Sequence, residues 1–198
     1  ANWSSGVTPE FDTPAVIALP GAYTIGFPFG QLREIQSLDV SLGLVTLDMN
    51  GTKLTCNGLN GKGLTVADVA GGGLQLGGGT LEILSNGVVG DGAGSSGLLQ
   101  LDQASVTFNE VLSLGEQGFG QMTLANSSLV TADRLTIGNN GGTGLLESGI
   151  GDSMYFDPFD LLDYGLTITD GLLFSNGSLI EANGQGVWID TAGTLRAS

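Results

Sequence analysis

Apolar and polar residues alternate along most of the chain in short runs. The segment 97–119 shows the pattern clearly. Its apolar pairs are Leu99 and Leu101, Val106 and Phe108, and Leu112 and Leu114. Alternation of this kind places successive side chains on opposite faces of a β-strand. Gly, Asn, Asp and Ser separate the runs, and these residue types favour tight turns. The pattern therefore predicts short strands joined by turns.

The same pattern recurs along the chain. Residues 120–142 repeat residues 97–119 at an offset of 23 without a gap. The matched positions are Leu99 with Met122, Leu101 with Leu124, Val106 with Leu129, Leu112 with Leu135, Leu114 with Ile137 and Gly115 with Gly138. A copy that begins near Leu74 precedes them at an offset of 25. Weaker copies begin at Val45 and at Leu166, so the period is 23 to 25 residues.

Three short strands and three turns per repeat describe one coil of a β-solenoid. Inward side chains of successive coils then stack about 4.8 Å apart, and each coil contacts only its neighbours. We predict an all-β protein, a parallel β-solenoid of six or seven coils. A β-sandwich also alternates, but its strands are longer and lack a fixed repeat. A leucine-rich repeat fits less well, because no helical segment follows each strand.

Four segments are predicted along this solenoid. Residues 1–36 form an N-terminal cap or first coil, since they hold four of the five prolines and several aromatic residues. Residues 37–150 form the coils, and residues 166–198 form the C-terminal coils. Between them, residues 151–165 interrupt the repeat as a loop or short helix, because Asp157 followed by Pro158 is a typical helix start.

The interruption is rich in apolar residues for a solvated loop. It either folds back over the solenoid or forms a contact with another subunit. A third alternative is a calcium site through Asp152, Asp157, Asp160 and Asp163, although the spacing of an EF-hand is absent. The N-terminal segment is a second candidate for subunit contact. The candidate contact residues are Tyr155, Phe156, Phe159, Leu162, Phe11 and Phe27.

Charge and cysteine content narrow the range of partners. The chain has 5 basic and 20 acidic residues and a net charge of −15, so it repels nucleic acid and anionic membranes. No apolar run reaches the roughly 18 residues that span a bilayer, so no membrane insertion is expected. Cys56 is the only cysteine, which excludes an internal disulfide and a cysteine-based zinc site. We interpret it as a small core residue.

The residue types needed for most catalysis are missing. The chain has no His, so Ser-His-Asp and Cys-His arrangements and histidine metal sites are excluded. A carboxylate-based polysaccharide lyase or hydrolase remains conceivable, and its candidates are Asp102, Glu110, Asp133 and Arg134. Their spacing does not place them at one wall position. Ice binding would need a regular Thr array, and the Thr residues are scattered. We therefore predict no enzyme activity and no cofactor.

The beginning of the chain carries a further signal. The segment 2–17, NWSSGVTPEFDTPAVI, resembles the opening motif of secreted bacterial solenoids, in which coils like LTIGNNGGTG (residues 135–144) follow. This group includes autotransporter-type passenger domains and other surface adhesins. The resemblance implies a right-handed parallel β-helix displayed outside a bacterial cell. Residues 151–164 are not part of the group's pattern.

These observations predict a non-enzymatic extracellular structural protein. It would be a module or subunit of a surface adhesin, sheath or filament that assembles through its ends and its interruption, by self-association or with other surface proteins. The alternative is a carbohydrate-binding or polysaccharide-cleaving β-helix, for which the exposed aromatic candidates are Trp188 and Tyr155.

Overall fold

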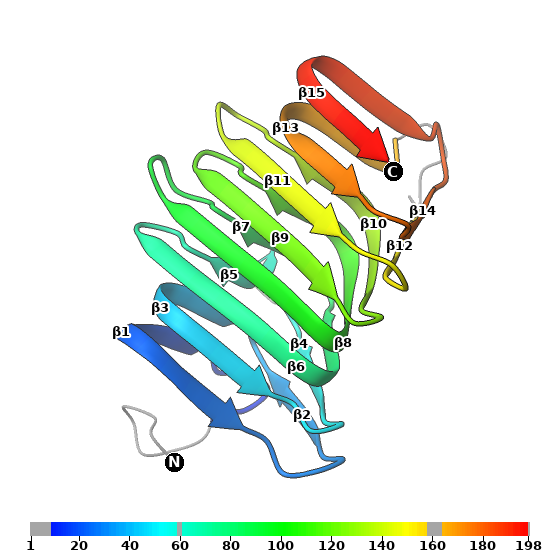
Figure 1. Cartoon of the computed structure of the whole chain (residues 1–198). Helices are drawn as coiled ribbons and strands as arrows, with labels where there is room; N and C mark the ends of the chain where they lie inside the picture. The colour runs from blue at the N-terminus through cyan, green and yellow to red at the C-terminus, as the bar shows by residue number, and fades with distance from the viewer. Residues whose placement is uncertain (1–8, 59–60, 158–163, 198) are drawn as a thin grey trace.

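A computed structural model describes residues 9–58, 61–157 and 164–197, and within them the regular structure consists entirely of strands. In chain order the strands are β1 (Ala15–Gly26), β2 (Leu32–Ile35), β3 (Leu38–Asp48), β4 (Lys53–Cys56), β5 (Lys62–Val66), β6 (Gly71–Ile83), β7 (Asn86–Val89), β8 (Ser96–Leu114), β9 (Phe119–Ala125), β10 (Leu129–Ile137), β11 (Thr143–Ser148), β12 (Ser153–Phe156), β13 (Leu166–Ser175), β14 (Leu179–Ala182) and β15 (Val187–Ala197). Their pairings are parallel and stack the chain into a β-solenoid of about seven turns (Figure 1). The predicted fold class is confirmed, and the sandwich alternative is excluded.

Each coil contributes one strand segment to each of three walls. Wall A contains residues 22–26, 44–48, 73–77, 98–102, β9, β11, 172–175 and 194–197. Wall B contains β2, β4, residues 80–83, 105–108 and 129–132, β12 and β14. Wall C contains residues 15–17, 38–40, β5, β7, 112–114, 135–137, 166–168 and 187–189. Figure 1 shows the coils stacked along one axis, with the two ends of the chain at opposite ends of the stack.

The core is a set of columns that run along the solenoid axis inside the walls. One column of wall A consists of Val45, Leu74, Leu99, Met122, Leu146 and Leu173, each at most 1% exposed. One column of wall C consists of Val40, Val66, Val89, Leu114, Ile137 and Ile168, all fully buried. The alternation seen in the sequence is thus the inward and outward alternation of each wall. Stacked aliphatic side chains stabilise the fold by about 25 cal/mol for each Å² of apolar surface that they bury.

The gap-free repeat of 23 residues is wrong for one wall. In wall B, Val106 pairs with Val130 rather than with Leu129, and Val130 is 1% exposed whereas Leu129 faces outward. The corner before β10 is longer than its counterpart in β8, because Asn126 and Ser127 both adopt positive φ there. A register shift between Ala132 and Arg134 restores the offset before wall C. A slip of one residue exchanges the two faces of a strand, so the correction decides which side chain is core.

The interruption at residues 151–165 is also shorter than the sequence suggests. Residues 153–156 form β12, which lies in wall B between β10 and β14. Met154 and Phe156 continue the inward columns of that wall, and both are at most 1% exposed. The repeat therefore continues through Phe156. The predicted short helix falls at residues 158–163, which lie outside the described residues.

The C-terminal copy begins one wall away from the position that the sequence suggests. Leu166 and Ile168 pair with Leu135 and Ile137 in wall C. The counterparts of Leu74 and Leu99 in wall A are instead Leu146 and Leu173. The sequence did not show which wall the copy begins in, because only residues 169–170 separate the wall C and wall A segments of β13. The two segments therefore form one continuous strand.

Glycines form a column of their own at the corner between walls C and A. Successive coils place Gly43, Gly72, Gly97, Gly120, Gly144, Gly171 and Gly193 in register. A Cβ on Gly120 would lie 2.1 Å from the carbonyl oxygen of Val89 and 2.2 Å from the amide nitrogen of Gly115. The backbone of the chain itself occupies the space of the missing side chain. This corner can therefore close only where the column residue is glycine.

The large buried side chain of Phe108 fills space that a side chain at Gly87 would otherwise occupy. Phe108 in wall B is 1% exposed, and its ring reaches the inner face of wall C at Gly87. A Cβ on Gly87 would lie 2.1 Å from Cε1 of Phe108. The flanking coils place Leu64 and Leu112 at the register position of Gly87. At this level of the core the phenylalanine ring from wall B fills the space that leucine side chains from wall C fill in the neighbouring coils.

Candidate functional site

The residues proposed for polysaccharide cleavage are divided between two corners of the solenoid. Asp102 lies at the end of its wall A segment, where its carboxylate accepts a hydrogen bond of 2.7 Å from the side chain of Asn126. Glu110, Asp133 and Arg134 lie between walls B and C, and Arg134 Nε is 3.6 Å from Asp133 Oδ2. The four side chains therefore do not converge on one position, because Asp102 lies at a different corner from Glu110, Asp133 and Arg134.

A second group of charges lies near the glycine corner. Lys62 Nζ lies 2.5 Å from Asp91 Oδ2 and joins two neighbouring coils. Burial raises the pKa of Asp39 above its ordinary value, and the carboxylates of Asp68 and Asp91 raise it further. The hydroxyl of Ser41 donates a hydrogen bond of 2.7 Å to Asp39, which lowers the pKa but does not cancel the effect of burial.

We expect Asp39→Asn to stabilise the fold at neutral pH. A carboxyl group whose pKa is higher in the folded than in the unfolded chain binds more protons when folded, so stability falls as pH rises through that window. The charged form of Asp39 therefore costs stability at pH 7, and the variant avoids this cost. Denaturation at pH 7 should show a higher midpoint than wild type, and the difference should vanish below about pH 3.5, where both states are protonated. Asp48→Asn, on an exposed position of wall A, is the control. A pH-independent difference would contradict this assignment.

Cys56 is a core residue, as its residue type predicts. It lies in an inward column of wall B in register with Ile35 and Ile83, and it is fully buried. Burial raises the pKa of its thiol to about 12. Because the thiolate is the reactive form, the folded protein offers no reactive thiol at this position.

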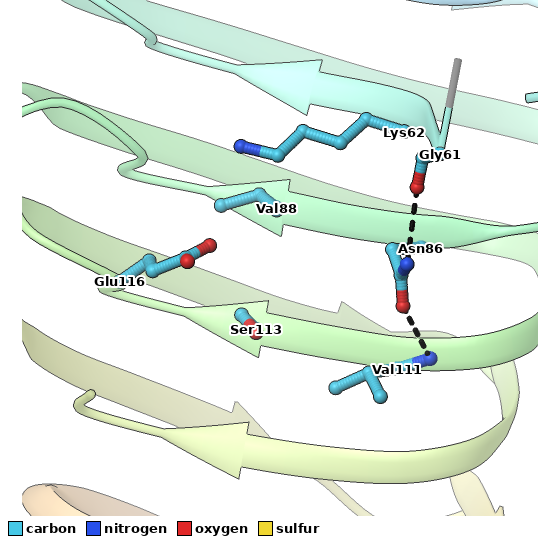
Figure 2. Close-up of a pocket in the computed structure, with 7 residues that line it drawn as sticks. All are labelled: Gly61, Lys62, Asn86, Val88, Val111, Ser113 and Glu116. Atoms are coloured by element: carbon cyan, nitrogen blue, oxygen red, sulfur yellow. Dashed lines mark hydrogen bonds between the residues drawn. The ribbon is translucent and has the colours of Figure 1, made fainter. Parts of the chain in front are cut away.

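A groove of about 400 Å³ runs along the outer face of wall C (Figure 2). Asn86 lies across it and joins three coils, since its Nδ2 donates to the Gly61 carbonyl at 3.0 Å and its Oδ1 accepts from the Val111 amide at 3.1 Å. Lys62 and Glu116 lie toward opposite sides of the groove in this view. The Asn86 amide thus holds neighbouring coils together, and Lys62, which also lines the groove, is engaged in its ion pair with Asp91.

The predicted contact residues fall into different environments. Tyr155 faces outward from wall B and is half-buried, so part of its ring is accessible. Phe156 is 1% exposed inside the same strand, so its side chain cannot contact a partner. Its neighbours in the column are Ala132 and Ala182, which leave room for the ring. Phe159 and Leu162 lie outside the described residues.

The two aromatic candidates near the N-terminus also differ. Phe11 is exposed. Phe27 packs against the core at the N-terminal end and donates a backbone hydrogen bond of 2.9 Å to Asp48. For the carbohydrate alternative, Trp188 is half-exposed on wall C and its ring lies 5.5 Å from the ring of Tyr164. Tyr155 lies on wall B, so the two aromatic candidates do not line one groove.

The acids proposed as calcium ligands are used in other ways where they are described. Asp152 is 1% exposed, and its carboxylate accepts backbone hydrogen bonds from Ser128 at 2.8 Å and Gly149 at 2.9 Å. Asp157 accepts a hydrogen bond of 3.3 Å from the side chain of Asn183. Asp160 and Asp163 lie outside the described residues. Asp152 thus closes a corner between walls A and B.

The C-terminal end of the solenoid is the feature that the sequence did not single out. Several inward residues of the last coil line a pocket of about 510 Å³. Its lining consists of Leu166, Ser175, Ser178, Leu179, Ile180, Ala182, Val187 and Leu195. The hydroxyl of Ser178 lies 2.7 Å from that of Ser148 and 2.6 Å from that of Ser175, so the polar part of the lining is internally hydrogen-bonded. An apolar end of this kind is a candidate contact surface.

Searches of the described residues for other kinds of site were negative. No helical segment there has the length and hydropathy to cross a bilayer. Nor do three acidic, His or Cys side chains within residues 9–58, 61–157 and 164–197 come together as metal ligands. The chain matches no family model, no curated protein and no solved structure. The resemblance of its first segment to secreted bacterial solenoids therefore stays a prediction, and the function must be argued from the geometry.

Proposed function

We propose that the protein is a non-enzymatic structural module, a stiff β-solenoid that works outside a bacterial cell and assembles through its end. One observation carries the proposal. The buried columns run without a break through the coils and reach the last coil as exposed Val187, Ile189 and Leu195. A continuous column gives a rod whose coils each support the next, and an apolar end gives it a place to join a partner.

Three further features support this proposal. The chain has a net charge of −15 and only five basic residues, so neighbouring molecules that approach side by side repel each other. The polar side chains of wall corners, such as Asn86 and Asp152, are engaged in bonds between coils or in closing turns. The opening motif resembles that of exported solenoids. An extracellular adhesin, sheath or filament would use each of these properties.

The proposal is tested by measuring shape and ligand binding together. Small-angle scattering should give an elongated particle, since about seven coils at about 4.8 Å extend roughly 34 Å per chain. A broad polysaccharide array, read with calcium and with a chelator, should show no binding, and the same polysaccharides should release no new reducing ends or unsaturated uronate. Saturable binding or turnover of any of them would replace this proposal with the carbohydrate alternative.

A further inference from the structure

The two ends of the solenoid differ in how well their inward residues are covered. In wall C the first coil contributes Ala15 and Ile17, which are 2% and 5% exposed. The last coil contributes Val187 and Ile189 in the same columns, and these are 42% and 43% exposed. In wall C the inward residues of the first coil are therefore covered, whereas those of the last described coil are exposed, and we call this last coil the open end.

The N-terminal end also carries features that oppose pairing with another strand. Arg33 lies in register with the inward residue Leu54, so a guanidinium group occupies the place of an apolar column residue. β1 contains Pro20 and Gly21, and its register on β3 shifts between Ile17 and Ala22. Proline, bulges and inward-pointing charges are devices that protect the edge strands of a sheet.

The C-terminal end lacks the proline and the inward-pointing charge, although the register of β15 on β13 also shifts between Ile189 and Ala192. Within the described residues, β14 pairs only with β12 and β15 pairs only with β13, so one edge of each lacks a strand partner. Neither strand contains proline, and their inward column residues Ile180, Val187, Ile189 and Leu195 are all apolar. An unprotected edge beside an exposed apolar column is a template for association.

We propose that the open end of one chain is covered by the open end of a second copy, related by a two-fold axis perpendicular to the solenoid. The inference rests on the proposed function and names the partner of its contact surface. In this arrangement β15 of one chain pairs antiparallel with β15 of its partner, and the exposed columns meet each other. A two-fold contact uses the same surface on both chains and closes at the dimer.

Charge and coverage favour this arrangement over the alternatives. A head-to-tail stack would set the open end against Arg33 and the closed first coil, where Ala15 and Ile17 have almost no exposed surface left to bury. A side-by-side contact would bring together walls that share the net charge of −15. The end-to-end contact buries apolar surface and keeps most carboxylates of the two chains apart. Added salt should therefore strengthen the dimer, because it screens the remaining repulsion.

Sedimentation velocity of the whole chain from about 1 to 200 µM, the range in which modest interfaces dissociate, should show a monomer–dimer equilibrium and no larger species. Leu195→Lys places a charge in the open end and should raise the dimer dissociation constant about tenfold or more. The control Phe29→Lys changes a residue that is 80% exposed at the opposite end and should leave the constant unchanged. Monomer throughout the range, growth beyond the dimer, or a constant that responds to Phe29→Lys but not to Leu195→Lys would overturn the proposal.

Distances between spin labels on the two chains test the arrangement of the dimer without the Leu195→Lys substitution. Cys56 is buried, so single labels can be introduced by Phe29→Cys at the N-terminal end or Gln185→Cys at the C-terminal end. In the dimer, labels at 185 should lie within about 30 Å of each other and labels at 29 about 70 Å apart, twice the length of the rod. A short distance between 29 on one chain and 185 on another would show head-to-tail stacking instead. If the protein binds no polysaccharide, has an elongated shape and stays monomeric, the dimer proposal is overturned. The proposed structural role is then unaffected.

Discussion

Gly120→Ala is expected to remove about 3 kcal/mol or more of folding stability, a large fraction of the roughly 5–15 kcal/mol by which domains are typically stable. The new Cβ would lie 2.1 Å from the Val89 carbonyl oxygen and 2.2 Å from the Gly115 amide nitrogen. Both atoms belong to backbone that pairs with neighbouring coils, so neither can move without breaking the stack. Chemical denaturation followed by circular dichroism measures the loss, and a folded yield too low to denature would agree with it.

The matched control for this prediction is Gly77→Ala. Gly77 lies in wall A, away from the glycine corner. Its backbone is outside the left-handed region, and a Cβ at this position would meet no atom within 4 Å. We expect a change within about 0.5 kcal/mol, as for an ordinary surface substitution. Equal destabilisation by the two variants would mean that the loss does not come from the close approach at the corner, because the effect of Gly→Ala on the unfolded chain is itself stabilising.

The second large effect is expected at Phe108. Phe108→Ala should cost about 3–5 kcal/mol, because it empties the centre of a coil whose opposite wall has no side chain at Gly87 to collapse into the gap. Gly87→Ala should also destabilise, since its Cβ would lie 2.1 Å from Cε1 of Phe108. The same denaturation measurement applies to both variants.

A double-mutant cycle tests whether the two residues share one volume. The smaller side chain of Phe108→Leu should make room for Gly87→Ala, so the double variant should be more stable than the sum of the single variants by at least about 1 kcal/mol. Gly77→Ala combined with Phe108→Leu should be additive, because no atom lies near the Gly77 Cβ position. Additivity of the Gly87 pair would show that the walls adjust independently.

Much of the fold could be predicted because solenoids contact only their neighbours. The alternation of Leu99 and Leu101 predicts a strand. Its repetition at Met122 and Leu124 also predicts which residues stack on each other. Strand type, parallel stacking and the columns of wall A follow from that pattern alone. The pairing of strands that are distant in the chain usually cannot be predicted from one sequence. Here it follows from the nearly constant offset between repeats.

The errors have a common physical cause, which lies in the corners. Leu129 and Val130 are equally acceptable as core residues, and only the conformation of Asn126 and Ser127 decides between them. Phe156 looked like a contact residue because it stands beside Tyr155 and Asp157, yet its column neighbours are small. Assembly through the ends was predicted, but the residues that form the open end were not, for a different reason. Exposure of Leu195 depends on what is stacked above it, and composition carries no record of that.

The uneven corners have a consequence for how such a chain can change. Residues 169–170 suffice to join wall C to wall A in β13, whereas residues 90–96 make the same connection before Gly97, and the glycine column keeps its register in both places. The entropy of closing a loop grows only with the logarithm of its length, about 0.6 kcal/mol for each doubling. Foreign peptides inserted between Ala93 and Gly94, which are both exposed, should therefore be carried on the outside of the solenoid without displacing the core residues of any coil. The corners are the places where a protein of this design can acquire new surface while its scaffold stays the same.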